Sequence, residues 1–98
     1  MPLFYYMTED FPSRKRKFQK ALLKLELEYV DFFTEVNKEW PNDYVSINSY
    51  IVFGTHNHIN GLQVYFTFSH EGLPPLPYDL REKCINLFTM IFESFRPL

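Results

Sequence analysis

Residues 44–70 read YVSINSYIVFGTHNHINGLQVYFTFSH, and this stretch predicts a β-hairpin at the centre of the fold. Apolar and polar residues alternate along both of its halves, with the period of a strand that buries one face. The dipeptide Asn60-Gly61 separates the halves and is a strong signal for a two-residue hairpin turn. With this turn, Phe53 pairs with Phe68 and the apolar residues of both halves share one face.

The predicted hairpin has two unlike faces. The apolar face carries Val45, Ile47, Ile51, Phe53, Leu62, Val64, Phe66 and Phe68. The opposite face carries tyrosines and small polar residues: Tyr44, Ser46, Asn48, Tyr50, His56, His58, Gln63, Tyr65, Thr67 and Ser69. In the predicted register, the two histidines lie opposite Tyr65 and Gln63.

This stretch contains no Lys, Arg, Asp or Glu, since every such residue lies in residues 9–43 or 71–96. Exposed sheets normally carry charge, which discourages pairing with other strands. The polar face is therefore expected to be covered by the rest of the fold, by a second copy or by a partner. Rigid tyrosines beside adaptable Ser and Asn are typical of binding surfaces, which favours a partner.

Helical patterns flank the hairpin. Residues 8–13 are rich in helix-start residues, and a helical period continues to Trp40. Its predicted core stripe is Phe18, Leu22, Leu25, Tyr29, Phe32, Val36 and Trp40. A second apolar stripe, formed by Leu23, Leu27 and Val30, lies on another side of the same helix. An extended proline-rich connector over residues 71–77 leads to a last helix predicted over residues 79–95.

These elements predict an α+β fold. Residues 3–7 form a short apolar run that suits an N-terminal edge strand. We expect a two-layer sandwich in which a small antiparallel sheet packs on two helices, in the order β-α-β-β-α. The length suits a single domain over residues 1–98.

Composition restricts the class of protein. The net charge of −2 argues against a strongly electrostatic nucleic-acid binder. Cys84 has no second cysteine to bond, so it is expected to be a small core residue in a reducing compartment. No stretch approaches the roughly 20 apolar residues of a membrane span. A cytoplasmic location without membrane attachment is therefore expected.

The charges of the long helix run against its dipole. Basic residues occupy its first half: Arg14, Lys15, Arg16, Lys17, Lys20 and Lys24. An acidic stripe follows, formed by Glu28, Asp31, Glu35 and Glu39. The helix dipole favours the opposite order, so the pattern indicates either a solvated face or a charged partner.

The two histidines of His56-Asn57-His58 project to one side of an extended strand, where they could share a metal ion or act as acid and base. The nearby residues do not supply a full ligand set, because Cys84 belongs to a buried stripe. We expect no cofactor and no metal.

The sequence favours a non-enzymatic protein-binding module. The specific hypothesis is a small cytosolic inhibitor, of the immunity-protein or antitoxin kind, that blocks a functional surface of a basic protein such as a nuclease toxin. Two alternatives stay open: a homodimeric structural or assembly subunit, and a small His-based enzyme or metal-binding protein. The expected partner-binding residues are Glu28, Asp31, Glu35, Glu39, Tyr44, Ser46, Asn48, Tyr50, His56, His58, Gln63 and Tyr65.

Overall fold

The computed structural model describes residues 5–7, 11–40, 43–59, 61–69 and 71–92. The elements are β1 (Tyr5–Met7), α1 (Phe11–Glu26), the 3₁₀ turn η1 (Leu27–Tyr29), α2 (Val30–Lys38), the 3₁₀ turn η2 (Ile47–Tyr50), β2 (Ile51–His58), β3 (Gly61–Phe68) and α3 (Tyr78–Phe92). The predicted α+β class is confirmed. The predicted start of the first strand at residues 3–4 and the predicted end of the last helix at residues 93–95 lie outside the described residues.

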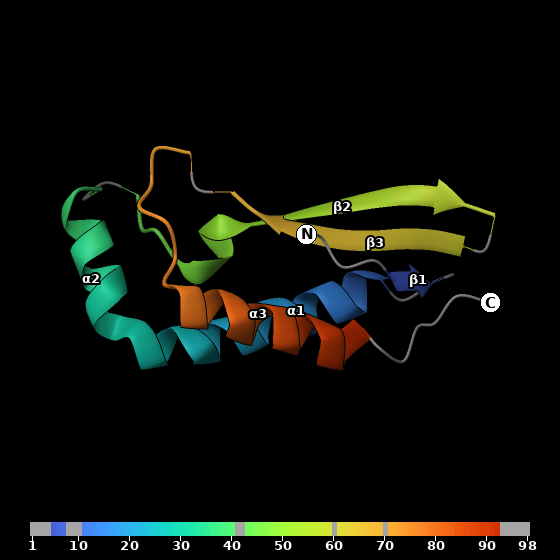
Figure 1. Ribbon diagram of the computed structural model, residues 1–98, viewed down its shortest axis with the longest axis horizontal. Helices are drawn as coiled ribbons and strands as arrows, with labels where there is room; N and C mark the ends of the chain where they lie inside the picture. Colours follow the sequence, from blue (N-terminus) through green and yellow to red (C-terminus); the bar gives the residue numbers. More distant parts are fainter. Residues whose placement is uncertain (1–4, 8–10, 41–42, 60, 70, 93–98) are drawn as a thin grey trace.

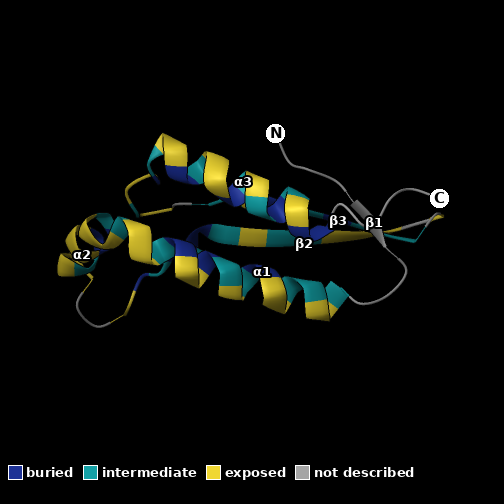
Figure 2. Ribbon diagram, turned by 90° about the horizontal axis from the view of Figure 1, so that it is seen from below, coloured by how far each residue is buried: buried dark blue, intermediate teal, exposed yellow. Residues whose placement is uncertain are grey.

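The sheet is antiparallel, and its strand order is β1-β3-β2. The sheet and the helices form two layers (Figure 1). Both α1 and α3 lie against the same face of the sheet (Figure 2). Phe18 of α1 and Phe88 of α3 both contact Phe66 of β3. The other face has no helix among the described residues. The helix α2 continues beyond the end of the sheet that is far from the hairpin tip (Figure 1).

The hairpin register differs from the predicted register by two residues. Phe53 pairs with Phe66 and His58 pairs with Gly61, so the turn falls one residue earlier than Asn60-Gly61. Gly61 opens β3 with φ of 122°, a conformation that glycine adopts without steric cost. A shift of two keeps the parity of every side chain. The predicted apolar face is therefore confirmed for its residues in β2 and β3, whereas the prediction that His56 lies opposite Tyr65 is wrong.

Residues 44–50, predicted to open the hairpin, do not form a strand. Ser46 and Ser49 form a capping box at the start of η2, because serine side chains offer the backbone local hydrogen bonds that compete with a ladder. The turn buries Tyr50 completely, and its hydroxyl donates to the carbonyl of Pro74 at 2.6 Å. The predicted position of Tyr50 on the outward polar face is therefore wrong.

The predicted long helix breaks at η1. Tyr29 leaves the helical conformation, with φ −128° and ψ 35°. Its hydroxyl donates to the Asp79 carboxylate at 2.6 Å, and the Lys83 ammonium lies 5.1 Å from the centroid of its ring. The chain has no proline or glycine between Ser13 and Trp40 that would break a helix. The break instead coincides with the contacts of Tyr29 with α3.

The break changes which residues are buried after it. Phe33, which lies off the predicted stripe, is buried, whereas Trp40 at the predicted end of the stripe is 40% exposed. The predicted stripe holds before the break, where Phe18, Leu22 and Leu25 are buried, and Val36 of the same stripe is buried after it.

The break also accounts for part of the reversed charge pattern. Lys24 lies in the last turn of α1 and Asp31 in the first turn of α2, so each sits where its helix dipole favours it. Arg14 donates to the carbonyl of Ile91 at 2.9 Å, close to the C-terminus of α3, where a cation is also favourable. Arg14, Lys24 and Asp31 thus occupy favourable positions, whereas Lys15, Arg16 and Lys17 lie near the N-terminus of α1, against its dipole.

The core is an aromatic cluster around Phe18, which is fully buried. Its ring centroid lies 5.8 Å from that of Phe53 and 5.5 Å from that of Phe66, both in the sheet. The centroid of Phe88 in α3 is also 5.5 Å away. One side chain thus joins α1 to the sheet and to α3. No helix within the described residues is long and apolar enough to cross a membrane.

We predict that Phe18→Ala lowers the free energy of unfolding by about 3–5 kcal/mol, because it removes a buried phenyl ring and leaves a cavity among three elements. Denaturant unfolding followed by circular dichroism measures this. The control is Leu27→Ala, whose side chain is 72% exposed and should change stability by less than about 0.5 kcal/mol. Equal effects of the two variants would contradict the assignment of Phe18 as the centre of the core.

Candidate functional site

The outer face of the hairpin is an uncharged surface. Its residues lie on β2 and β3 with the parity opposite to the core face: Val52, Gly54, His56, Gln63, Tyr65 and Thr67. Val52 is 49% exposed, and His56 and Thr67 are also exposed. We call these six residues the outer sheet face.

Tyr65 and Gly54 form the centre of the outer sheet face. They pair directly across the two strands. A Cβ atom at residue 54 would overlap the end of the Tyr65 ring, so the phenol ring lies over the glycine. The missing side chain thus lets an aromatic ring lie close against the neighbouring strand, which gives the face a flat centre.

The structure divides the predicted partner-binding residues among different places. His56, Gln63 and Tyr65 share the outer sheet face. The backbone of His58 is in β2, but its side chain lies outside what the structure describes. Tyr44, Ser46 and Asn48 belong to the segment around η2 and not to a strand; Tyr50 of that segment is buried.

The acidic stripe is far from the outer sheet face. Glu28 lies in η1 and its carboxylate accepts from Lys83 at 3.4 Å. Glu35 in α2 accepts from Lys38 at 2.8 Å, a contact that raises the pKa of the lysine. Asp31 and Glu39 are exposed. Because α2 and the hairpin tip are at opposite ends of the molecule, one small contact surface does not include both sets (Figure 1).

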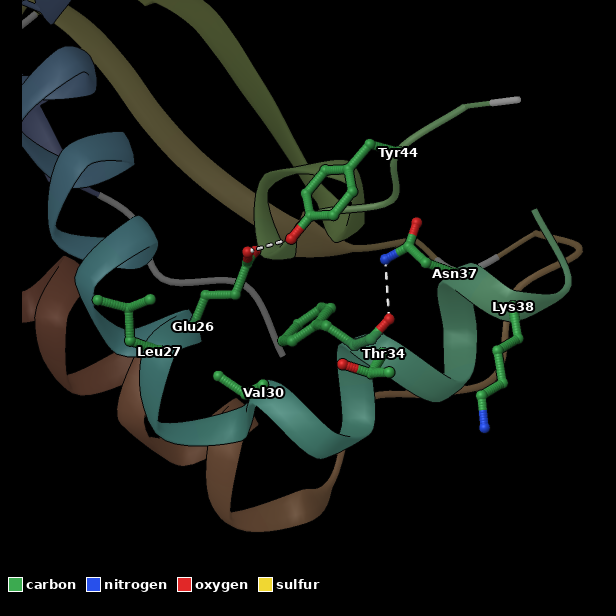
Figure 3. Close-up of a pocket in the computed structure, with 8 residues that line it drawn as sticks. Glu26, Leu27, Val30, Thr34, Asn37, Lys38 and Tyr44 are labelled. Carbon is green, nitrogen blue, oxygen red and sulfur yellow. Dashed lines mark hydrogen bonds between the residues drawn. The ribbon is translucent and has the colours of Figure 1, made fainter. Parts of the chain in front are cut away.

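A hollow of about 370 Å³ lies at the helix break (Figure 3). Apolar side chains of the break form part of its wall, with Leu27 and Val30 both exposed to solvent. The hydroxyl of Tyr44 reaches across to the carboxylate of Glu26, as Figure 3 shows. The full lining is Glu26, Leu27, Val30, Phe33, Thr34, Asn37, Lys38 and Tyr44.

Glu26 holds the segment before β2 against the helices. One carboxylate oxygen accepts from the backbone N–H of Ile47 at 2.6 Å, and the other accepts from the hydroxyl of Tyr44 at 2.8 Å. The second hydrogen bond raises the pKa of Tyr44, because losing the proton would place a phenolate against the carboxylate. Both oxygens of Glu26 therefore have structural partners.

Asn37 of α2 also holds the segment before β2, through hydrogen bonds to the backbone of Val45. Its amide oxygen accepts from the N–H of Val45 at 2.7 Å, and its amide nitrogen donates to the carbonyl of the same residue at 2.9 Å. The side chain thus supplies the pair of hydrogen bonds that a neighbouring strand would supply. Sequence reasoning missed this role of Glu26 and Asn37, although both are polar residues between the two apolar stripes, a pattern that could have indicated inward contacts.

The histidine site that the sequence suggested as an alternative includes His58, whose side chain lies outside what the structure describes. His56 lies opposite Gln63, and Gly54 is the residue opposite Tyr65. Across the described ranges, no group of three His, Cys, Asp or Glu side chains could hold a metal ion. Cys84 is fully buried, and this burial raises the pKa of its thiol to about 12.

Comparison with protein-family models, with curated proteins and with solved structures finds no match to this chain. The case for a function therefore depends on the surfaces described above.

We predict that Glu26→Gln lowers the pKa of Tyr44 toward the ordinary tyrosine value, because the amide no longer offers a charged acceptor. Alkaline absorbance titration of phenolate measures this, and Tyr44→Phe in each background isolates the one tyrosine. Since the pKa of Tyr44 is raised on folding, its contribution to stability is complete below the unfolded value of 10.0 and is lost as the pH rises through the folded value. An equal pKa of Tyr44 in the wild type and in Glu26→Gln would contradict the hydrogen bond between Tyr44 and Glu26.

We predict that the rate at which Cys84 reacts with a thiol reagent is limited by the rate at which the protein unfolds around it. Its pKa of about 12 leaves little thiolate at neutral pH, and its burial excludes the reagent. Labelling with Ellman's reagent in the presence and absence of denaturant measures this. Rapid, complete labelling of the folded chain would contradict the buried position.

Proposed function

We propose that this chain acts by binding a protein partner rather than by catalysis, and that the outer sheet face is the contact surface. The single observation that supports the proposal most strongly is that this face carries no charge and that no helix of the described part of the chain covers it. The charged side chains of the described residues lie outside β2 and β3, while the outer sheet face offers Val52, Thr67 and the ring of Tyr65 over Gly54.

The composition of this face suits a protein partner. Aromatic residues are enriched and charged residues depleted at the centres of protein interfaces, because a buried unpaired charge is costly. Tyr65 supplies a large ring at low conformational cost, and His56, Gln63 and Thr67 supply adaptable hydrogen bonds around it.

We propose a secondary role for the acidic stripe. Asp31 and Glu39 are exposed, and Glu28 and Glu35 lie beside lysines at the surface. At the far end of the molecule, these carboxylates would speed the encounter with a basic partner without forming the buried contact. This division of roles fits an inhibitor of the immunity-protein or antitoxin kind, whose small surface blocks the working surface of a basic protein.

The outer sheet face is tested with a charge substitution and a matched control. Val52→Lys places a charge on this face, while Met90→Lys places the same charge on the helix layer at a side chain that is 65% exposed. We expect proteins from the native host to be retained by the immobilised wild-type chain and by Met90→Lys, and to bind Val52→Lys at least about tenfold more weakly, since burying an unpaired lysine costs more than the 1.4 kcal/mol that this factor represents.

Two outcomes contradict the proposal. Equal retention of the partner by Val52→Lys and by the wild type would show that the outer sheet face is not the contact. Loss of the partner from Met90→Lys alone would place the contact on the helix layer. Circular dichroism of both variants confirms that each bait is folded.

A further inference from the structure

The edge of β2 that is directed away from β3 is suited to pair with one more strand. In the order β1-β3-β2, β2 is an outer strand, and no strand of the described residues lies beyond it. It pairs continuously with β3 from Ile51 to His58, without a bulge. Sheet edges are usually protected by charge, by proline or by a bulge, and β2 contains no charged residue and no proline.

The hairpin geometry determines which backbone groups of β2 are directed away from β3. The N–H of Ser69 donates to the carbonyl of Tyr50 at 2.9 Å, so these two residues form a hydrogen-bonded pair. Such pairs alternate along an antiparallel ladder. Residues 52, 54 and 56 therefore bond to β3, while Ile51, Phe53, Thr55 and Asn57 direct their N–H and C=O groups outward.

We propose that β2 pairs antiparallel with β2 of a second copy of this chain, about a two-fold axis at Gly54. In this register Ile51 meets Asn57 and Phe53 meets Thr55, so all four residues with outward backbone groups find partners. An axis at Phe53 would leave Asn57 unpaired, and an axis at Thr55 would leave Ile51 unpaired. The axis at Gly54 is therefore the one that satisfies the whole edge.

The absence of charge on β2 fits a second copy as the occupant. In a pair of identical strands, each strand carries the same charges, so charges of one sign close to the two-fold axis would repel. Because β2 has no charge, it is compatible with its own copy. On the helix side, Phe53 is partly buried and Thr55 is exposed, so Thr55 of the second copy would cover the open edge of the phenyl ring.

One charge opposes this association. The Lys15 ammonium lies 5.0 Å from the centroid of the Phe53 ring, and the axis brings the two copies of this lysine to the same side of the joined sheet. The repulsion is screened at physiological salt, where the Debye length is about 8 Å. The pairing does not depend on the proposed function, because it uses the edge of β2 rather than the outer sheet face.

Amide hydrogen exchange tests the pairing directly. In a single chain with a free edge, the amides of residues 53, 55 and 57 exchange quickly and those of residues 52, 54 and 56 exchange slowly. In the paired state, both sets are protected. We expect this alternation at low concentration and its loss at high concentration, together with a doubling of mass in sedimentation equilibrium at physiological salt.

Two variants at one position sharpen the test. Thr55→Pro removes an outward N–H and no hydrogen bond to β3, so it should keep the hairpin and give a monomer. Thr55→Lys places two lysines near the two-fold axis and should weaken the dimer at least tenfold. The control is Thr67→Lys, which adds the same charge to an exposed position on the central strand β3 and should remain a dimer.

Three results would overturn the proposal. The first is a monomer at millimolar concentration with alternating exchange along β2. The second is a dimer in which the alternation persists, which would place the contact elsewhere. The third is a dimer that Thr55→Lys, folded by circular dichroism, leaves as tight as the wild type.

Discussion

The burial of Phe18 between the sheet and α3 is the contact on which the rest of the structure depends. Its ring contacts aromatic residues of β2, β3 and α3, so it joins the three elements that form the two layers. Aromatic side chains bury on the order of 150–250 Å² each, which gives a short chain enough apolar contact for one core. Both α1 and α3 pack on one face, and among the described residues no helix covers the other face and no strand lies beyond β2.

A second constraint acts at the break in the helix. Tyr29 contacts Asp79 and Lys83 of α3, and the break lets Glu26 and Asn37 reach the same short segment before β2. Their side chains satisfy backbone groups that would otherwise need a neighbouring strand. The break thereby creates the hollow lined by Leu27 and Val30, while Glu26 and Tyr44 form its polar side.

The distribution of charge links this architecture to the proposed roles. The helices carry the charged side chains, several of which bond within the fold, such as Arg14 at the end of α3 and Glu28 beside Lys83. The hairpin carries none. Charged helices favour solvent, and an uncharged sheet favours contact with another protein chain, so the two layers are suited to different surroundings.

The sequence by itself determined the order of the elements and the two faces of the hairpin. Alternation along a strand and the period of a helix are local properties, so Val64 and Phe66 could be assigned to the core, and His56, Gln63 and Tyr65 to the opposite face, without knowing any distant contact. Only the tertiary structure decided the register, the helix break and the burial of Tyr50. The register depends on how the two strands pair. The helix break and the burial of Tyr50 depend on residues far apart in the chain: Tyr29 on Asp79, and Tyr50 on Pro74. A local pattern carries no information about such contacts, because their geometry exists only after the layers have packed.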